Sequence, residues 1–171
     1  MTAHVASAVL SLGSNLGDRE STIRDAVSDL RALPEVTVVA VSGLVETPAL
    51  KPEGVDVDAP AYLNAAVLVK TTLPPMRLLA AVNVIELAHG RVREERWGDR
   101  TLDIDIVTMD GIVQRDEQLT LPHPRAAERA FVLVPWLDID PDAKLPGYGR
   151  VDSLVANLDV DISPYPAKGL S

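Results

Sequence analysis

The sequence predicts an α+β fold, in which helices pack against a mixed or antiparallel β-sheet. Three observations support this prediction: runs typical of strands interleave with runs of helical spacing, a hairpin signal sits beside helices of crossover type, and a chain of 171 residues fits one domain. We expect a single domain over residues 1–162 and a flexible C-terminal tail over residues 163–171.

Strands are expected where short runs are apolar or alternate with a period of two. VASAVLSLG ends at Gly13, β-branched residues fill VTVVAVSGLVET before Pro48, and YLNAAVLVKTTL follows a long surface loop expected over residues 49–61. TLDIDIVTM alternates cleanly, and the Asp110-Gly111 turn behind it predicts a hairpin with the IVQ segment.

Helices are expected where apolar residues recur every 3.6 positions between start and stop signals. Asp18 can cap a helix that ends at Pro34, and PPMRLLAAVNVIELAHG begins with proline and ends at Gly90. Two further helices are expected over residues 126–139 and 151–158.

The composition excludes several classes of protein. A net charge of −9 with a pI near 4.7 argues against non-specific nucleic-acid binding, which needs a basic field. Because there is no Cys, disulfides, thiolate zinc sites and a Cys nucleophile are excluded. No apolar run approaches the ~18 residues of a membrane span. We therefore expect a soluble, cytoplasmic protein that binds neither nucleic acid nor membranes, and we expect a monomer.

Asp103 and Asp105 lie two positions apart in the predicted strand TLDIDIVTM. Both carboxylates should therefore leave one face of the sheet, while Leu102, Ile104 and Ile106 enter the core. Carboxylates in this arrangement can hold one or two Mg²⁺ ions, which keep water and phosphate oxygens as further ligands. The alternative is a solvated strand face, although Asp is depleted in strands.

Arg91, Arg93, Arg96 and Arg100 gather directly before this strand. Guanidinium groups pair bidentately with phosphate oxygens and keep their charge. Taken alone, the run is typical of a solvated loop whose arginines pair with neighbouring acids. Together with the two aspartates, it indicates a site that neutralises a bound Mg²⁺–polyphosphate.

A second group of residues could recognise a planar ligand. Tyr62 and Asn64 share one strand face, and Phe131 follows Arg129 in a predicted helical segment. Rings offer stacking, and an amide offers a donor and an acceptor, but ordinary core aromatics would give the same pattern. His123 lies between two prolines and could donate to phosphate or be a structural hydrogen-bonding residue. SLGSNLGDR lacks the lysine of a phosphate-binding P-loop.

Five motifs then occur in one order: GSNLGDR, ETPAL, YLNAAV, IELAHGRVREERWGDRTLDIDI and LTLPHPRAAERAFVLVP. Together they resemble the 6-hydroxymethyl-7,8-dihydropterin pyrophosphokinase family of folate biosynthesis. The resemblance spans Val9 to Pro141, and the residues after Pro141 are not diagnostic.

The resemblance implies a three-layer αβα, ferredoxin-like fold with helices on both faces of the sheet. It implies transfer of pyrophosphate from ATP to the hydroxymethyl oxygen of the dihydropterin, with release of AMP and with two Mg²⁺ ions bound by Asp103 and Asp105. The implied catalytic residues are Arg91, Arg100, Asp103 and Asp105; the ATP-binding residues are Glu86, Arg93, Arg96, Trp97, Ile106, Thr120, His123 and Arg129; the pterin-binding residues are Thr47, Pro48, Tyr62, Asn64, Trp97 and Phe131.

One position departs from the family pattern, because Gln118 stands where some relatives place an arginine toward the triphosphate. Two other functions remain open from the residues. One is a different Mg²⁺-dependent nucleotidyl or glycosyl transferase, and the other is a pterin or nucleotide binder without activity.

Overall fold

The computed structural model describes residues 4–15, 17–51, 54–56, 61–89, 102–159 and 162–165, and for residues 49–51 and 54–56 it describes the backbone only. The catalytic loop predicted over residues 91–100 lies outside the described residues. No helix of the described parts is both long enough and apolar enough to cross a membrane.

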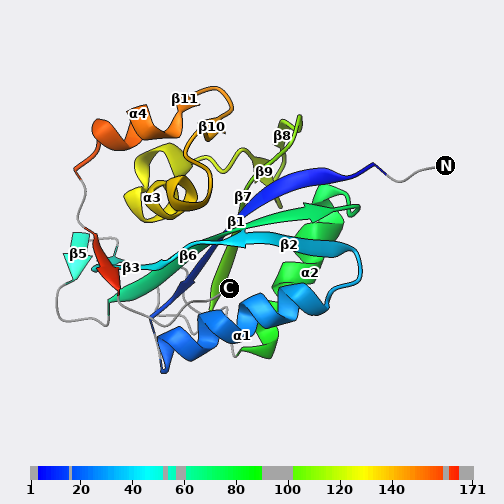
Figure 1. Cartoon of the computed structure of the whole chain (residues 1–171), viewed down its shortest axis with the longest axis horizontal. Helices are drawn as coiled ribbons and strands as arrows, with labels where there is room; N and C mark the ends of the chain where they lie inside the picture. Colours follow the sequence, from blue (N-terminus) through cyan, green and yellow to red (C-terminus); the bar gives the residue numbers. More distant parts are fainter. Residues whose placement is uncertain are drawn as a thin grey trace.

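A twisted sheet forms the middle layer (Figure 1). Its strands follow the order β12-β3-β6-β1-β7, β2 also pairs with β6, and the pairings of these six strands are antiparallel. The strands that α1 connects, β1 and β2, have β6 between them, and the strands that α2 connects, β6 and β7, have β1 between them. This is the split βαβ arrangement of a ferredoxin-like fold. The bounds are β1 Ala6–Ser14, β2 Val36–Val41, β3 Leu44–Thr47, β6 Tyr62–Thr71, β7 Asp103–Met109 and β12 Ser163–Tyr165.

Helices cover both faces of the sheet, which confirms the predicted three-layer α+β architecture. The helices α1 (Arg19–Ala32) and α2 (Pro75–Ala88) lie below the sheet in Figure 1, and α3 (Ala130–Ile139) and α4 (Val151–Ala156) lie above it. We call these two sides the α1/α2 face and the α3 face.

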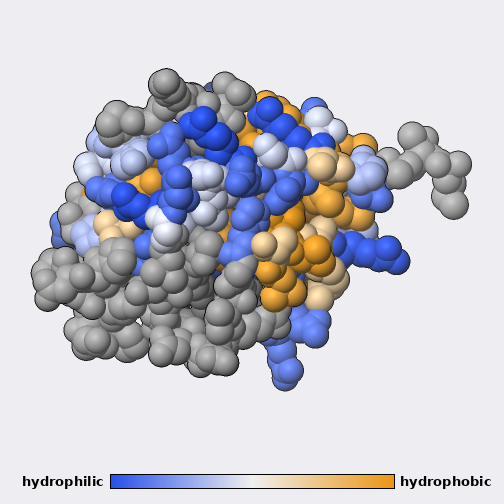
Figure 2. Space-filling model, turned by 90° about the horizontal axis from the view of Figure 1, so that it is seen from below, coloured by the Kyte–Doolittle hydropathy of each residue, from blue (hydrophilic) through white to orange (hydrophobic). Residues whose placement is uncertain are grey.

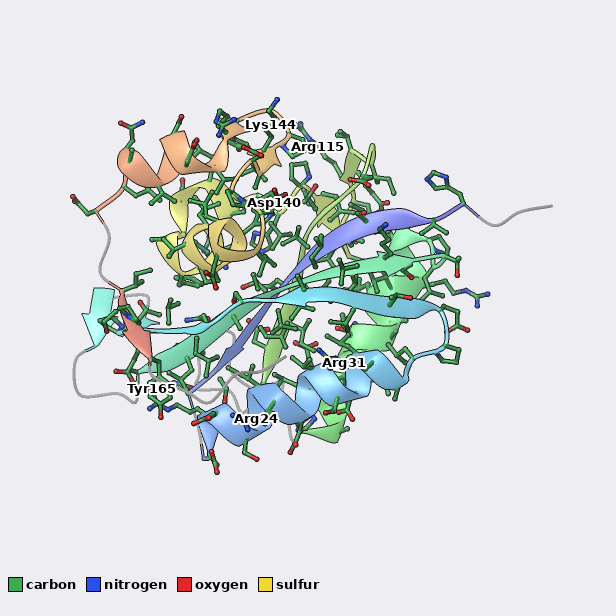
Figure 3. The ribbon with its side chains drawn as sticks, viewed as in Figure 1. Arg24, Arg31, Arg115, Asp140, Lys144 and Tyr165 are labelled. Carbon is green, nitrogen blue, oxygen red and sulfur yellow. The ribbon has the colours of Figure 1, made fainter. Side chains whose placement is uncertain are left out.

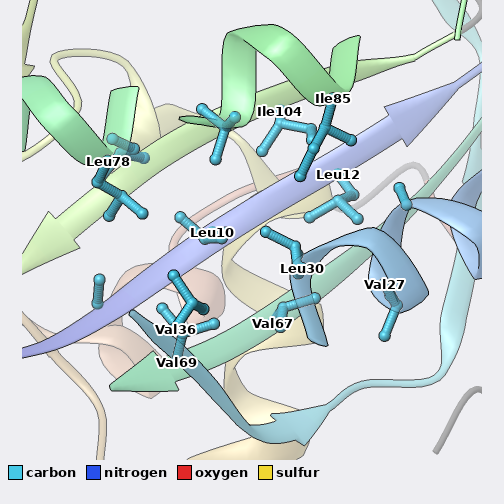
Figure 4. Close-up of a cluster of buried hydrophobic side chains, with 14 of the residues drawn as sticks. Leu10, Leu12, Val27, Leu30, Val36, Val67, Val69, Leu78, Ile85 and Ile104 are labelled. Carbon is cyan, nitrogen blue, oxygen red and sulfur yellow. The ribbon is translucent and has the colours of Figure 1, made fainter. Parts of the chain in front are cut away.

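Strand alternation divides the apolar residues between two cores. Leu10 and Leu12 of β1 point to the α1/α2 face, where they pack with Leu30 and Leu78 (Figure 4). Val9 points to the α3 face, in a second cluster with Ala66, Val107, Leu133 and Trp136. Strands covered on both sides explain why the VASAVLSLG run is almost continuously apolar.

On the α1/α2 face, α1 begins at its predicted cap, and α2 has an exposed apolar surface. The carboxylate of Asp18 accepts the Ser21 N–H at 3.1 Å, which confirms the predicted cap of α1. The helix α2 is apolar on its outer side too, and its side chains Met76, Val84 and Leu87 are exposed. Figure 2 views the molecule from this side and shows apolar residues gathered in one area.

The predicted second strand, residues 36–47, is divided into β2 and β3. At the break, Ser42 N–H donates to the Ala66 carbonyl at 2.9 Å, and Ala66 N–H donates to Ser42 Oγ at 2.8 Å. The Ser42 side chain thus replaces a backbone acceptor, and Gly43 N–H leaves the ladder to donate to Asp138 at 2.9 Å.

The predicted hairpin between TLDIDIVTM and IVQ is wrong. The turn forms, with Gly111 at a φ of 67° and Ile112 N–H donating to the Met109 carbonyl at 3.2 Å, but β7 pairs with β1. Instead β8 (Gln114–Arg115) pairs with β9 (Thr120–Leu121), because the Asp116 carboxylate accepts backbone N–H groups of Gln118 and Leu119 and closes that turn.

Three other segments carry more local structure than predicted. The expected loop 49–61 contains the paired strands β4 (Ala49–Lys51) and β5 (Gly54–Asp56). In the expected helix 126–139, a 3₁₀ turn η1 (Ala126–Glu128) precedes α3, because Arg129 is extended between them. Before α4, β10 (Lys144–Leu145) pairs with β11 (Gly149–Arg150).

The C-terminal tail expected over residues 163–171 also needs correction at its start. Residues 163–165 form β12, which adds to the edge of the main sheet beside β3. Tyr165 packs against the core of the α1/α2 face, so apolar burial adds to the strand pairing that holds this segment.

Candidate functional site

Asp103 and Asp105 lie on one face of β7, as predicted from their spacing. Ile104 and Ile106 between and after them are buried in the core of the α1/α2 face, while both aspartates are only partly buried. The carboxylates therefore leave the sheet on the α3 face, about 7 Å apart at their Cα atoms. Two partly exposed acids in this position place negative charge on the α3 face.

A histidine and an arginine face the second of these acids. His123 Nε2 and Arg129 Nη1 each lie 4.0 Å from Asp105 Oδ2. These separations are too long for hydrogen bonds but short enough for strong electrostatic coupling at a partly buried site. The extended conformation of Arg129 between η1 and α3 directs its side chain to β7.

His123 is kept neutral by its surroundings. Burial lowers its pKa to about 4, the charges of Arg129 and Arg125 act in the same direction, and Asp103 opposes them. Its Nδ1 accepts the Arg125 N–H at 3.2 Å, so the proton of the neutral ring is on Nε2, the nitrogen that faces Asp105. His123 is thus a neutral hydrogen-bond donor directed at the anionic part of the site.

An amide lies on the same face, two strands away from Asp103. In the sheet register, Asn64 pairs with Gly13 and Gly13 pairs with Asp103. Asn64 is 3 % exposed, and its Nδ2 has no hydrogen-bond partner among the described residues. A Cβ on Gly13 would lie 2.8 Å from Asn64 Oδ1, so glycine is what leaves space beside the amide. A buried amide donor without a partner fits a ligand that brings a polar edge.

A pocket of about 650 Å³ shares Arg129 and Arg125 with the surroundings of His123 and Asp105. Its volume is typical of a site for a small molecule. The Arg129 guanidinium lies 5.6 Å from the centre of the Phe131 ring, which combines a flat apolar surface with a positive charge. The lining residues are Thr47, Pro124, Arg125, Glu128, Arg129, Ala130, Phe131, Asp159 and Ile162.

The structure brings together many of the predicted site residues but not all of them. Asp103, Asp105, His123, Arg129, Phe131, Thr47, Tyr62 and Asn64 belong to the α3 face or to the pocket on it. Pro48 follows Thr47 and is partly buried, and Thr120 is partly buried on β9. Arg91, Arg93, Arg96, Trp97 and Arg100 lie outside the described residues.

Two predicted ATP-binding residues have buried side chains. Ile106 is 2 % exposed in the core of the α1/α2 face. Glu86 of α2 is 1 % exposed, and its Oε2 accepts the Ile104 N–H at 2.9 Å. Glu86 therefore anchors β7 between the two aspartates from the opposite side of the sheet.

Sequence reasoning missed several residues of this site. A glycine inside a strand run signals close approach of another group, so Gly13 could have been found from the sequence. Arg125, Glu128, Asp159 and Ile162 carry no local signal, because only the fold of the chain after β9 brings them to Thr47.

The two aspartates fit a hard divalent cation. Mg²⁺ prefers carboxylate oxygens and keeps several waters or phosphate oxygens, so two protein carboxylates are sufficient. Within the described ranges, no group of three or more His, Cys, Asp or Glu residues could form a metal cage by itself.

Comparison with known proteins gives one consistent answer. The sequence model of a family described as 7,8-dihydro-6-hydroxymethylpterin-pyrophosphokinase (HPPK) matches residues 9–141. The chain is 47 % identical over 152 residues to a 2-amino-4-hydroxy-6-hydroxymethyldihydropteridine pyrophosphokinase of Methylorubrum extorquens, covering 89 % of this chain and 93 % of the relative. A protein of the same name from Bacillus subtilis is 46 % identical over 132 residues, which cover 77 % of each chain.

Solved structures share the fold. The wild-type HPPK-DHPS of Plasmodium falciparum with pteroate superimposes with a TM-score of 0.69 at 17 % identity, over 91 % of this chain. The match spans 43 % of that longer chain, and at this identity the likeness concerns the fold alone.

Proposed function

The chain belongs to the 7,8-dihydro-6-hydroxymethylpterin-pyrophosphokinase family, and we propose that it carries out the reaction of that family with Asp103 and Asp105 as the metal-binding carboxylates. The reaction transfers the pyrophosphoryl group of ATP to the hydroxymethyl oxygen of 6-hydroxymethyl-7,8-dihydropterin, and AMP leaves. One juxtaposition carries the assignment: two carboxylates, a neutral histidine and an arginine meet on the face that also presents Asn64.

Asp103 and Asp105 would hold two Mg²⁺ ions. Bound there, Mg²⁺ would neutralise the charge of the triphosphate, which an acidic protein otherwise repels, and would polarise the substrate hydroxyl, which is otherwise unreactive. Both carboxylates leave one face of β7, so they would hold the metal from the protein side, and waters or phosphate oxygens would supply the remaining ligands.

The phosphate groups would also contact the positive and neutral donors around Asp105. Arg129 supplies permanent charge, and His123 supplies an N–H without a charge that changes near neutral pH. Arg91, Arg93, Arg96, Trp97 and Arg100 stay predicted contributors to the triphosphate site, as do Glu86, Ile106 and Thr120 along the nucleotide.

The pterin would occupy the side of the site nearer to β3 and β6. Tyr62 and Phe131 offer ring faces, and Asn64 offers an amide whose Nδ2 is still free to donate within the described structure. Thr47 and Pro48 would contact the polar edge through their backbone, and Trp97 remains a predicted part of the closing loop.

The decisive experiment is product analysis. Purified protein with ATP, Mg²⁺ and 6-hydroxymethyl-7,8-dihydropterin should form AMP and the pterin diphosphate in equal amounts. ADP as the sole nucleotide product would favour a different kinase reaction. Tight pterin and nucleotide binding without turnover would favour a binder without activity, and in both cases the proposal fails.

Three further predictions accompany this proposal. A cytoplasmic location agrees with the absence of Cys, and lack of nucleic-acid binding agrees with the net charge of −9. A monomeric state is the simplest expectation, since the site as proposed uses residues of one chain.

A further inference from the structure

Arg19, the first residue of α1, contacts two residues that are distant from it in the sequence. Its Nη1 donates to Glu46 Oε2 of β3 at 2.9 Å and to the carbonyl of Ala61 at 2.8 Å. Arg24, one turn further along the same helix, instead forms a local i,i+4 pair with Glu20 at 2.7 Å. A local pair stabilises only its own helix, whereas Arg19 connects α1 to β3 and to the residue that precedes β6.

The two groups that Arg19 contacts are chain neighbours of residues in the proposed pterin site. Glu46 precedes Thr47, Ala61 precedes Tyr62, and Thr47 and Tyr62 are paired across β3 and β6. Glu46 pairs with Leu63, a residue of the α1/α2 core, so the carboxylate points away from the site face. Arg19 therefore holds the strand ends from one face, while Thr47 and Tyr62 leave from the other.

The C-terminal strand joins the same group. The Arg19 guanidinium lies 5.7 Å from the centre of the Tyr165 ring, and Figure 3 shows Tyr165 at the end of the sheet beside the start of α1. Ser163 of β12 pairs with Glu46 itself. Ile162, directly before β12, lines the pocket next to Thr47. One wall of the pocket therefore belongs to a segment that β3, and through it Arg19, holds in place.

We propose that Arg19 is a positioning residue for the pterin side of the site: it fixes the ends of β3 and β6 and the C-terminal strand relative to one another, without touching either substrate. This inference rests on the proposed function for its kinetic consequence. The Arg19 side chain is 23 % exposed and the Glu46 side chain is 36 % exposed. Water therefore screens this ion pair only in part, and the pair can hold the two segments in a fixed geometry.

The test compares Arg19→Met with Arg31→Met, which removes an exposed arginine from the last turn of the same helix. We expect Arg19→Met to raise the KM for 6-hydroxymethyl-7,8-dihydropterin by about tenfold, because pterin binding must then order strand ends that Arg19 no longer holds, while the KM for ATP changes by less than about twofold. Arg19→Lys, which keeps a charge but not the planar fork, should give an intermediate value. Arg31→Met should change neither constant.

A purely structural role has a different signature. If Arg19→Met lowers only the melting temperature, or raises both KM values equally, the proposal is overturned. Should Arg19→Met fail to fold, Glu46→Gln replaces it in the test, because it removes the charge of the partner. The KM for the pterin should then rise and the KM for ATP should not.

Amide hydrogen exchange of the ligand-free protein separates this proposal from the proposed function. In Arg19→Met, peptides that cover residues 44–47 and 61–64 should exchange faster than in the parent protein, and in Arg31→Met they should not. Unchanged exchange in Arg19→Met overturns the positioning role even if the parent enzyme forms AMP. If the parent protein forms no AMP but Arg19→Met still exchanges faster than the parent in these peptides, the positioning role is supported and only the proposed reaction is rejected.

Discussion

On the α1/α2 face, β1 presents Leu10 and Leu12, which are both 0 % exposed in an aliphatic core. On the α3 face, the same strand presents Ser11 and Gly13, which pair in the sheet with Asp105 and Asp103. The first face is closed by two long helices. The second is covered by α3 and α4, and on it Asp105 faces Arg129, which also lines the pocket with Phe131.

The difference shows how a small domain can separate stability from chemistry. Because strand side chains alternate, neighbouring residues of β1 and β7 point to opposite faces, so a single substitution can be directed at one face or the other. Substitutions in the core of the α1/α2 face should therefore change the free energy of unfolding, and substitutions of the site residues on the α3 face should change catalysis. Four predictions test this separation.

The largest effect is expected from the acids of the α3 face. Asp103→Ala and Asp105→Ala should each lower the rate of AMP formation on the order of a thousandfold, because charge neutralisation at the phosphates is lost. Their free energy of unfolding should change by less than about 1 kcal/mol, since both side chains are partly exposed. Rates come from AMP release and stabilities from urea unfolding. Near-normal rates in both variants would remove the metal assignment.

On the other face, Leu10→Ala should do the reverse. Truncation of a fully buried leucine should lower the free energy of unfolding by about 3 kcal/mol, from lost apolar burial and the cavity left behind. The AMP rate per folded molecule, measured well below the new midpoint of thermal unfolding, should stay within about twofold of the parent rate. A large loss of rate at full folding would mean that the two faces are coupled.

A smaller effect is expected from Gly13→Ala, which adds one methyl group to the α3 face. The new Cβ would lie 2.8 Å from Asn64 Oδ1, so the amide must move away from its present position. We expect the KM for the pterin to rise about tenfold and the stability to fall by about 1–2 kcal/mol, as overpacking does.

Gly147→Ala is the control for this change. Gly147 has a φ of 82° and nothing within 4 Å of an added Cβ, so alanine there costs stability through the backbone alone. The control should leave the pterin KM unchanged. Equal KM values for both variants would show that Gly13 has no special place beside the amide.

These contrasts also explain what the sequence alone could and could not predict. Alternation in TLDIDIVTM was sufficient to place Asp103 and Asp105 on one face, because the period of a strand is a local property. Helical spacing and the Asp18 cap located α1 for the same reason. The αβα layers and the pterin reaction came from the family motifs, not from periodicity.

What could not be predicted depends on register and long-range contacts. The row from Asn64 through Gly13 to Asp103 exists only because β1 pairs with both β6 and β7 in a particular alignment. The strand β12 was expected to be part of a tail, because its partner β3 lies more than a hundred residues earlier in the chain. The Ser42 break depends on a side chain that bonds to Ala66.

The smallest expected effect concerns His123, the neutral donor of the α3 face. Its pKa of about 4 in the folded protein lies below the ordinary value of 6.5, so the unfolded chain binds a proton first as the pH falls. The stabilising contribution is therefore complete above pH 6.5 and declines as the pH falls from there toward 4. Between pH 7.5 and 6 the metal-free protein should lose about 1 kcal/mol through this group.

His123→Gln should remove that part of the pH dependence, because glutamine does not titrate. Urea unfolding in EDTA at several pH values gives the two curves, and their difference isolates His123 from the other histidines. The charges of Arg129, Arg125 and Asp103 act on the ring, and Asp105 Oδ2 lies 4.0 Å from its Nε2. Parallel curves for the two proteins would show that the ring is as easily protonated in the folded state as in the unfolded chain, and that burial on the α3 face does not hold it neutral.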